Sequence, residues 1–156
     1  MISEPHKIND LIVVGHEQMA ADFSRILNSQ SKLCDELEAI ADGLPSSVDS
    51  QFVLRTAKRI LVIVKCAHDF EEGFLFPFLE ARMPQLAATL ERLRYEHWGD
   101  EEFAVDIHHA LREYVRLHDN ANVDALAWML RGFFEGMRRH IAFDREYLHP
   151  KIKEAN

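Results

Sequence analysis

The sequence predicts an all-α protein with an up-down-up-down four-helix bundle. Helix-breaking residues gather in three short clusters, at residues 41–50, 82–85 and 118–124. The four segments around these clusters have similar lengths, and each carries apolar residues at the i, i+3, i+4, i+7 spacing of an amphipathic helix. Because short connections between helices of matched length make consecutive helices antiparallel, we expect a single bundle domain formed by residues 1–156.

The first helix is expected over residues 7–43, because Gly43 and the following Pro45 form a helix stop. The second helix is expected over residues 48–82, and Pro77 should bend or loosen it near its end. Three serines are candidate N-caps for this second helix: Ser46, Ser47 and Ser50.

The third helix is expected over residues 85–118, with Pro84 suited to its first turn. The fourth is expected over residues 123–153, and either Asn120 or Asn122 can cap its start. At 1.5 Å per residue, each of the four helices would be about 45 to 55 Å long.

Composition and charge narrow the class of protein. Apolar residues make up 47% of the 156 residues, and the formal net charge of -8 provides no basic patch for nucleic acid. Cys34 and Cys66 form no close motif, which is typical of a reduced, intracellular protein. The apolar run that starts at Leu11 is too short for a signal peptide or a membrane span. We therefore expect a cytoplasmic protein with no nucleic-acid or membrane partner; its oligomeric state stays open.

Polar residues interrupt the apolar stripe of every helix. Each stripe contains a histidine, and three stripes also contain a carboxylate four residues later. The interrupting residues are His16 in the first helix, His68 and Glu72 in the second, His97 and Glu101 in the third, and His140 and Asp144 in the fourth. Counting residues from the helix ends places all seven in one layer of the bundle, roughly 10 Å thick.

This layer predicts a metal site. A single histidine on an apolar face is more often a hydrogen-bonded core residue than a ligand, but a buried carboxylate without a cation costs several kcal/mol. Two divalent or trivalent ions would neutralise the carboxylates and accept the neutral imidazoles. Four nitrogen and three oxygen ligands without a thiolate suit iron, with manganese or zinc as alternatives, and seven ligands exceed the need of one ion.

Four stretches resemble the motifs of the hemerythrin-like family, which is also called the HHE cation-binding domain. They are GHEQM, HDFEEGFLFP, YEHWGDEE and HIAFDREYLHP, and the resemblance covers essentially the whole chain. It implies a site with two iron ions, Fe²⁺ or Fe³⁺, bridged by carboxylates or by an oxo or hydroxo group. It also implies a small ligand such as O₂, NO or peroxide at an open iron position.

The resemblance further implies a role for each ligand. Glu72 and Asp144 would bridge the two irons, and His97 and His140 would bind one of them. His16 and His68 would bind the other iron, the one with the open position. Apart from the resemblance, Glu17 and Glu71 lie close to ligand histidines in sequence and are either auxiliary ligands or surface groups; the surface is the favoured position.

Glu101 departs from the pattern of the oxygen carriers in this family, which have HxxxH in the third helix. Glu101 either binds iron or leaves its place to water or another group. As a ligand it would favour the ferric state and disfavour reversible oxygen carriage, which would favour sensing, storage or redox chemistry.

Three functions are compatible with the sequence. The first is a non-haem di-iron protein that binds or senses a small ligand. The second is a di-iron redox or stress enzyme, such as an oxidase, a peroxidase or catalase-like enzyme or an NO-related enzyme. The third is a metal-free helical interaction module. A ferritin-like site is disfavoured, because the chain has one ExxH pattern, at Glu146 and His149, and that family needs two.

Overall fold

The structure, a computed structural model, describes the backbone of residues 5–155 and the side chains of residues 15–118 and 120–155. Within these residues all regular elements are helical and there is no strand. The elements in chain order are α1 (Pro5–Gly43), α2 (Ser50–Phe70), η1 (Glu71–Leu75), α3 (Phe76–Arg82), η2 (Pro84–Leu86), α4 (Ala87–Leu117), η3 (His118–Asn120), α5 (Val123–Phe143), η4 (Asp144–Leu148) and α6 (His149–Glu154). None of the helices described here has the length and apolar composition that a membrane crossing requires.

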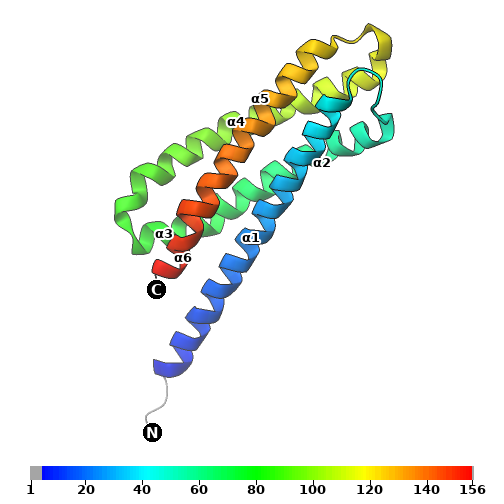
Figure 1. Cartoon of the computed structure of the whole chain (residues 1–156). Coiled ribbons are helices and arrows are strands. Elements are labelled where there is room, and N and C mark those ends of the chain that lie inside the picture. The colour runs from blue at the N-terminus through cyan, green and yellow to red at the C-terminus, as the bar shows by residue number, and fades with distance from the viewer. Residues whose placement is uncertain (1–4, 156) are drawn as a thin grey trace.

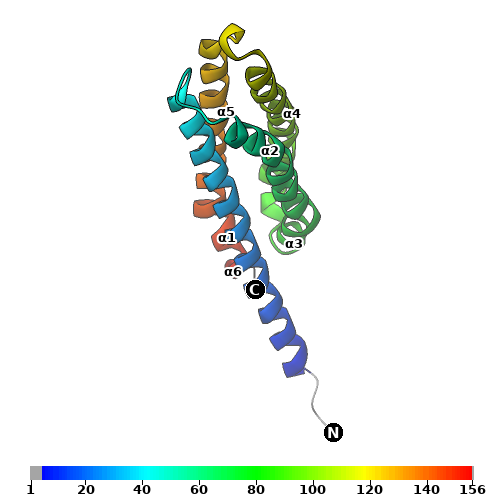
Figure 2. The same cartoon turned by 90° about the vertical axis from the view of Figure 1, so that its right-hand side faces the viewer.

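These elements form four long rods. One rod is α1, the second is the continuous run α2–η1–α3, the third is α4, and the fourth is the continuous run α5–η4–α6. The rods run side by side in alternating directions, and the first turns of α1 project past the end of the bundle (Figures 1 and 2). The α2–α4 and α1–α5 pairs are the most extensively packed pairs of helices in the described part of the bundle. The prediction of an up-down-up-down four-helix bundle is confirmed.

The helix starts differ in detail from the prediction. The N-cap of α2 is Asp49, whose carboxylate accepts a hydrogen bond of 3.0 Å from the backbone N–H of Gln51. None of the three candidate serines holds this position. The N-cap of α5 is Asn122, one of the two predicted candidates, and its side-chain oxygen accepts from the backbone N–H of Ala125 at 3.1 Å.

Two of the rods contain a π-helical turn, which is wider than an α-helical turn. In η1 the backbone N–H of Phe76 donates to the carbonyl of Glu71, and in η4 the N–H of His149 donates to the carbonyl of Asp144. A proline lies two residues after the last residue of each turn, at Pro77 and Pro150. Proline cannot donate a backbone hydrogen bond, and its ring presses against the carbonyl four residues earlier, so the helix widens. Pro77 therefore loosens the second rod, as predicted.

The extra residue in η1 changes which side chains face the core. Up to the start of the turn, the buried positions follow the alternating steps of four and three that keep one helix face inward. These positions, each at most 1% exposed, are Ile60, Val64, Ala67 and Glu71. A regular helix would next turn residue 74 inward. Instead Phe74 is 65% exposed, whereas Leu75 and Leu79 are fully buried.

The turn η4 has the same effect on the fourth rod. The buried positions up to the start of this turn include Leu130, Phe133, Met137 and Asp144. The following buried positions are 148 and 152, both at most 1% exposed, whereas Tyr147 is 38% exposed. Each π-turn thus begins at a buried carboxylate and shifts the apolar stripe beyond it by one residue.

This shift predicts unequal roles for two adjacent residues in η1. Leu75→Ala should lower the free energy of unfolding by about 2–5 kcal/mol, because it opens a cavity in the core. Phe74→Ala, which truncates a larger but exposed side chain, should change it by no more than about 0.5–1 kcal/mol. Urea unfolding of the two variants measures the difference, and a larger loss for Phe74→Ala would show that the helix is regular here.

Candidate metal centre

The seven predicted site residues fall into a buried group and a marginal group. His16, His68, His97 and Asp144 are buried, and the side chain of His140 is 7% exposed. In contrast, 41% of the Glu72 side chain and 44% of the Glu101 side chain are exposed. The prediction that all seven face the interior is therefore wrong for Glu72 and Glu101, which lie at the margin of the layer. Their assignment as metal ligands stays a prediction.

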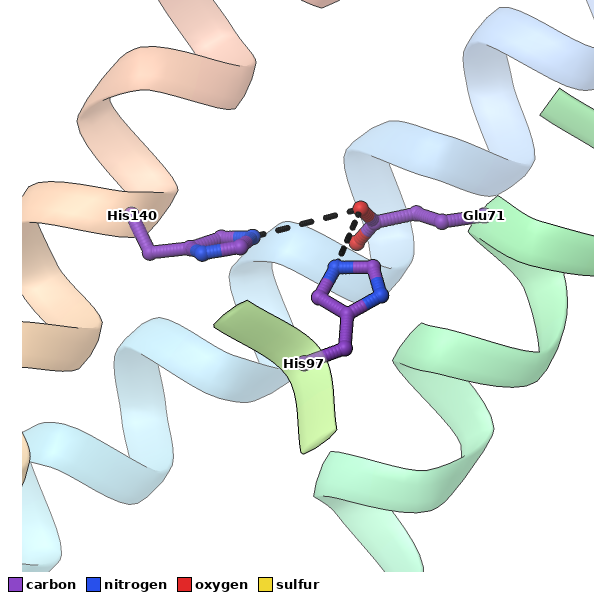
Figure 3. Close-up of side chains that lie close together, drawn as sticks. All are labelled: Glu71, His97 and His140. Atoms are coloured by element: carbon purple, nitrogen blue, oxygen red, sulfur yellow. Dashed lines mark ion pairs between the residues drawn. The ribbon is translucent and has the colours of Figure 1, made fainter. Parts of the chain in front are cut away.

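The centre of the layer is formed by Glu71, His97 and His140, whose potential ligand atoms all lie within 4.8 Å of one another. The three side chains come from η1, α4 and α5 and point toward one another (Figure 3). The Oε2 atom of Glu71 lies 3.1 Å from Nε2 of His97 and 3.9 Å from Nε2 of His140. Three separate rods thus direct one ligand atom each to a common point.

Two further residues adjoin this cluster. Asp144, which is fully buried, places Oδ2 at 3.1 Å from Nε2 of His140. His68 stacks its imidazole on that of His97, with ring centroids 3.9 Å apart and planes 12° from parallel. Five residues from α2, η1, α4, α5 and η4 therefore form one continuous group.

His16, the candidate from α1, is buried but is not one of the three residues of the central cluster. Its imidazole lies edge-on to the ring of Phe78 in α3, with centroids 4.7 Å apart. Its Nδ1 atom is buried and has no hydrogen-bond partner among the described residues. Glu17, the next residue, is exposed, as predicted.

Glu71 is the functional candidate that the sequence prediction missed. The surface was the favoured position for Glu71 and a role as auxiliary ligand was the alternative; the surface position is wrong, because the residue is 0% exposed. The apolar stripe of the second rod runs through Ile60 and Val64, and continuing it in steps of three and four leads to position 71. Glu72 was assigned to the core because it follows His68 by four residues, but its carboxylate reaches outward to His97 Nδ1, at 2.7 Å.

The electrostatics of the carboxylates depends on the imidazoles beside them. Burial alone would raise the pKa of Glu71, but the imidazoles of His140 and His97 outweigh it and lower the pKa to about 2. Burial raises the pKa of Asp144 to about 6, although the His140 imidazole opposes this change. Both side chains are therefore mainly carboxylates at neutral pH.

The imidazoles respond to the same charges. Burial opposes the charged form of His140, but Asp144 and Glu71 outweigh it and raise its pKa to about 11. The pKa of His68 is lowered by burial and by the positive charge of His97. Among the described side chains, no ion pair of a lysine or arginine involves Glu71 or Asp144. Within the described residues, the positive charge paired with these carboxylates is thus that of protonated imidazole.

The polar atoms of this layer fit a metal ion better than they fit one another. Eight buried atoms of the layer have no well-aligned hydrogen-bond partner in the described part of the chain: Nδ1 of His16, Nε2 of His68, His97 and His140, and both carboxylate oxygens of Glu71 and Asp144. A buried polar atom without a partner costs about 1–3 kcal/mol, and native proteins tolerate few of them. Ligand atoms about 2.1 Å from one octahedral ion lie about 3 Å apart, close to the two 3.1 Å separations found here. The donor set therefore fits a metal.

Two surface pockets lead toward this layer. A pocket of about 360 Å³ lies between α4 and α5 and is lined by His140, Asp100 and Gly136, among others. A second pocket, of about 650 Å³, is lined by His16 together with residues of α6. Small solutes can therefore approach the layer from the sides of His140 and of His16.

The raised pKa of His140 predicts that metal binding releases protons. In the metal-free protein the His140 imidazole holds a proton at neutral pH, because its pKa is about 11. That proton must leave before Nε2 can bind a cation, so the affinity should rise with pH up to that value and fall as the pH is lowered. Titration with Zn²⁺ in weakly buffered solution, followed by a pH indicator, should show about one proton released from this residue per chain. Metal uptake without proton release would contradict this assignment.

Comparison with known proteins adds one positive finding. The family model described as the hemerythrin HHE cation binding domain matches residues 15–152, which include every residue of the layer. Comparisons with curated proteins and with solved structures gave no match. The family match and the buried ligand cluster together support a metal-binding helical protein. The chain belongs to the hemerythrin HHE cation-binding domain family.

Proposed function

We propose that this protein is a non-haem di-iron protein that binds or senses a small ligand such as O₂, NO or peroxide. The observation that carries the proposal is the convergence of three imidazole Nε2 atoms and two fully buried carboxylates, all without hydrogen-bond partners in the described residues. Imidazole and carboxylate ligands without a thiolate suit iron, and manganese or zinc would also fit.

The number of donor atoms supports two ions. Four imidazoles and two carboxylates, each with two oxygens, exceed the four to six positions of one ion. Both oxygens of Glu71 and both oxygens of Asp144 are available, so each carboxylate can contact two cations. We assign the inner ligands to the buried residues: His16, His68, Glu71, His97, His140 and Asp144.

Each part of the chain has a definite task in this proposal. The imidazoles of His68, His97 and His140 hold their Nε2 atoms toward the layer, and Glu71 and Asp144 offset the positive charge of the cations. Core side chains such as Leu75 and Phe76, both fully buried, exclude water from one side. When bound, a pair of iron ions would supply redox chemistry and an open coordination position for a small ligand. The pocket beside His140 supports access for a molecule of that size.

The free cysteines support a reducing location. Cys34 is buried in the core and Cys66 is exposed, so the two do not form a disulfide. Burial raises the pKa of the Cys34 thiol to about 12, which keeps it protonated and unreactive. We propose a cytoplasmic location on this basis.

Two neighbouring substitutions test which glutamate is the inner ligand. Glu71→Gln should weaken Zn²⁺ binding by more than about 100-fold, because it removes a buried anionic ligand. Glu72→Gln should weaken it by about tenfold or less, because the amide oxygen can still accept from His97 Nδ1. Competition titrations of the two variants against the wild type measure both affinities. A greater loss for Glu72→Gln would make Glu72 the inner carboxylate, as the family resemblance implies.

The optical spectrum of iron-loaded protein tests the function itself. The protein is reduced without air, its iron is counted, and spectra are recorded before air, in air and after air is removed. We expect about two irons per chain and a charge-transfer band that appears with oxygen. If the band disappears when oxygen is removed, the protein binds oxygen reversibly, and if it persists, the redox or stress enzyme is favoured. Absence of both iron and band would leave only the metal-free interaction module.

A further inference from the structure

The second and third rods carry the same short motif and pair it reciprocally. The motif HxxxE occurs as His68–Glu72 in the second rod and as His97–Glu101 in the third. Nδ1 of His68 lies 2.9 Å from Oε1 of Glu101, and Nδ1 of His97 lies 2.7 Å from Oε1 of Glu72. Each histidine is therefore hydrogen-bonded to the glutamate of the opposite motif, and the two imidazoles stack between these contacts, with centroids 3.9 Å apart.

The antiparallel course of the rods makes this exchange geometrically natural. Residues four positions apart lie on the same face of a helix, one turn from each other. When two such pairs face each other in opposite directions, the first residue of one pair lies opposite the second residue of the other. The pair α2–α4 is among the most extensively packed in the bundle, which holds the two motifs in register.

The hydrogen bonds determine which imidazole nitrogen carries the proton. An ionised carboxylate can only accept a hydrogen bond, so Nδ1 of His68 and Nδ1 of His97 must be the donors. Once such an imidazole is neutral, the proton on Nδ1 leaves the lone pair on Nε2, because a neutral imidazole has one donor and one acceptor nitrogen. Both Nε2 atoms are buried and lack a hydrogen-bond partner within the described residues. The contacts thus reserve Nε2 of both imidazoles for a partner inside the layer.

We propose that Glu72 and Glu101 are positioning residues that form a reciprocal clasp with His97 and His68. The clasp keeps a proton on Nδ1 of both imidazoles and fixes their orientation, so that Nε2 is the nitrogen left to bind a cation. This inference rests on the proposed function, because it assigns the clasp to a metal centre in the same layer. It also gives Glu101 a role other than that of a metal ligand.

The position of Glu101 supports this role. Its carboxylate is bound to Nδ1, on a different edge of the imidazole from Nε2, and 44% of its side chain is exposed. The two oxygens of Glu71, in contrast, are buried beside the Nε2 atoms of His97 and His140. The layer therefore has an inner carboxylate beside the Nε2 atoms and outer carboxylates on the Nδ1 atoms.

Nitrogen NMR of the metal-free protein tests the clasp without any metal. At neutral pH, His68 should be in the Nδ1–H tautomer in the wild type and in Glu101→Gln, whose amide oxygen still accepts. Glu101→Ala should lose this tautomer preference. Glu102→Ala is the matched control, because Glu102 is the adjacent exposed glutamate of α4. A wild-type His68 in the Nε2–H tautomer, or a Glu101→Ala spectrum equal to that of Glu102→Ala, would overturn the proposal.

The affinity for Zn²⁺ tests the consequence of the clasp for the metal site. Glu101→Ala should bind Zn²⁺ about 10- to 100-fold more weakly than the wild type at unchanged stoichiometry, whereas Glu101→Gln should bind about tenfold more weakly at most. An equal loss in Glu101→Ala and Glu101→Gln would show that Glu101 binds the metal itself, and would overturn the positioning role. If the wild type bound no metal, the proposed function would fail, and the NMR result would still decide whether the clasp exists.

Discussion

The structure depends on the burial of two carboxylates, Glu71 and Asp144, in the middle of a helical core. Ionised groups in such a place are tolerated only with compensating cations. No arginine or lysine is paired with either of them in the described part of the chain, and the imidazoles of His97 and His140 lie beside them instead. The carboxylates are stabilised either by protonated imidazoles or by metal ions. A proton and a metal ion compete for the same imidazole nitrogen, so one nitrogen cannot hold both. The layer is therefore both the least apolar part of the core and the part suited to hold a cation.

The two π-turns explain how the helices carry these groups without losing their apolar stripes. Each turn begins at a buried carboxylate, ends before a proline, and advances the inward face by one residue. Leu75 and Leu148 follow their carboxylates four residues later and close the core beneath the layer. The second and fourth rods thus use the same local solution, whereas α1 and α4 have none and contribute a histidine from a regular helix. Widened turns of this kind are rare in proteins and are frequently found at functional sites.

Much of the fold and part of the site could be predicted from the sequence. The clusters of helix-breaking residues predicted where the four rods end, because these residues act on the local backbone. The spacing of apolar residues predicted that the rods are helices with one buried face. Counting residues along antiparallel helices predicted that His68, His97 and His140 come together, since the rise of a helix is constant. The inward position of Glu71 was missed because a one-residue change of helical phase decides between two adjacent glutamates. The outward position of Glu101 depends on a contact with His68 in another helix, and such a contact is not encoded in local spacing.

The most direct test of the central claim is the anomalous X-ray scattering of iron in crystals of the iron-loaded protein. The account predicts anomalous peaks inside the bundle, between Glu71, His97 and His140 and next to Asp144, with Glu101 still on Nδ1 of His68. Iron found only at the surface, or a layer without an anomalous peak in protein that has been loaded with iron, would contradict the claim that this buried layer is a metal centre.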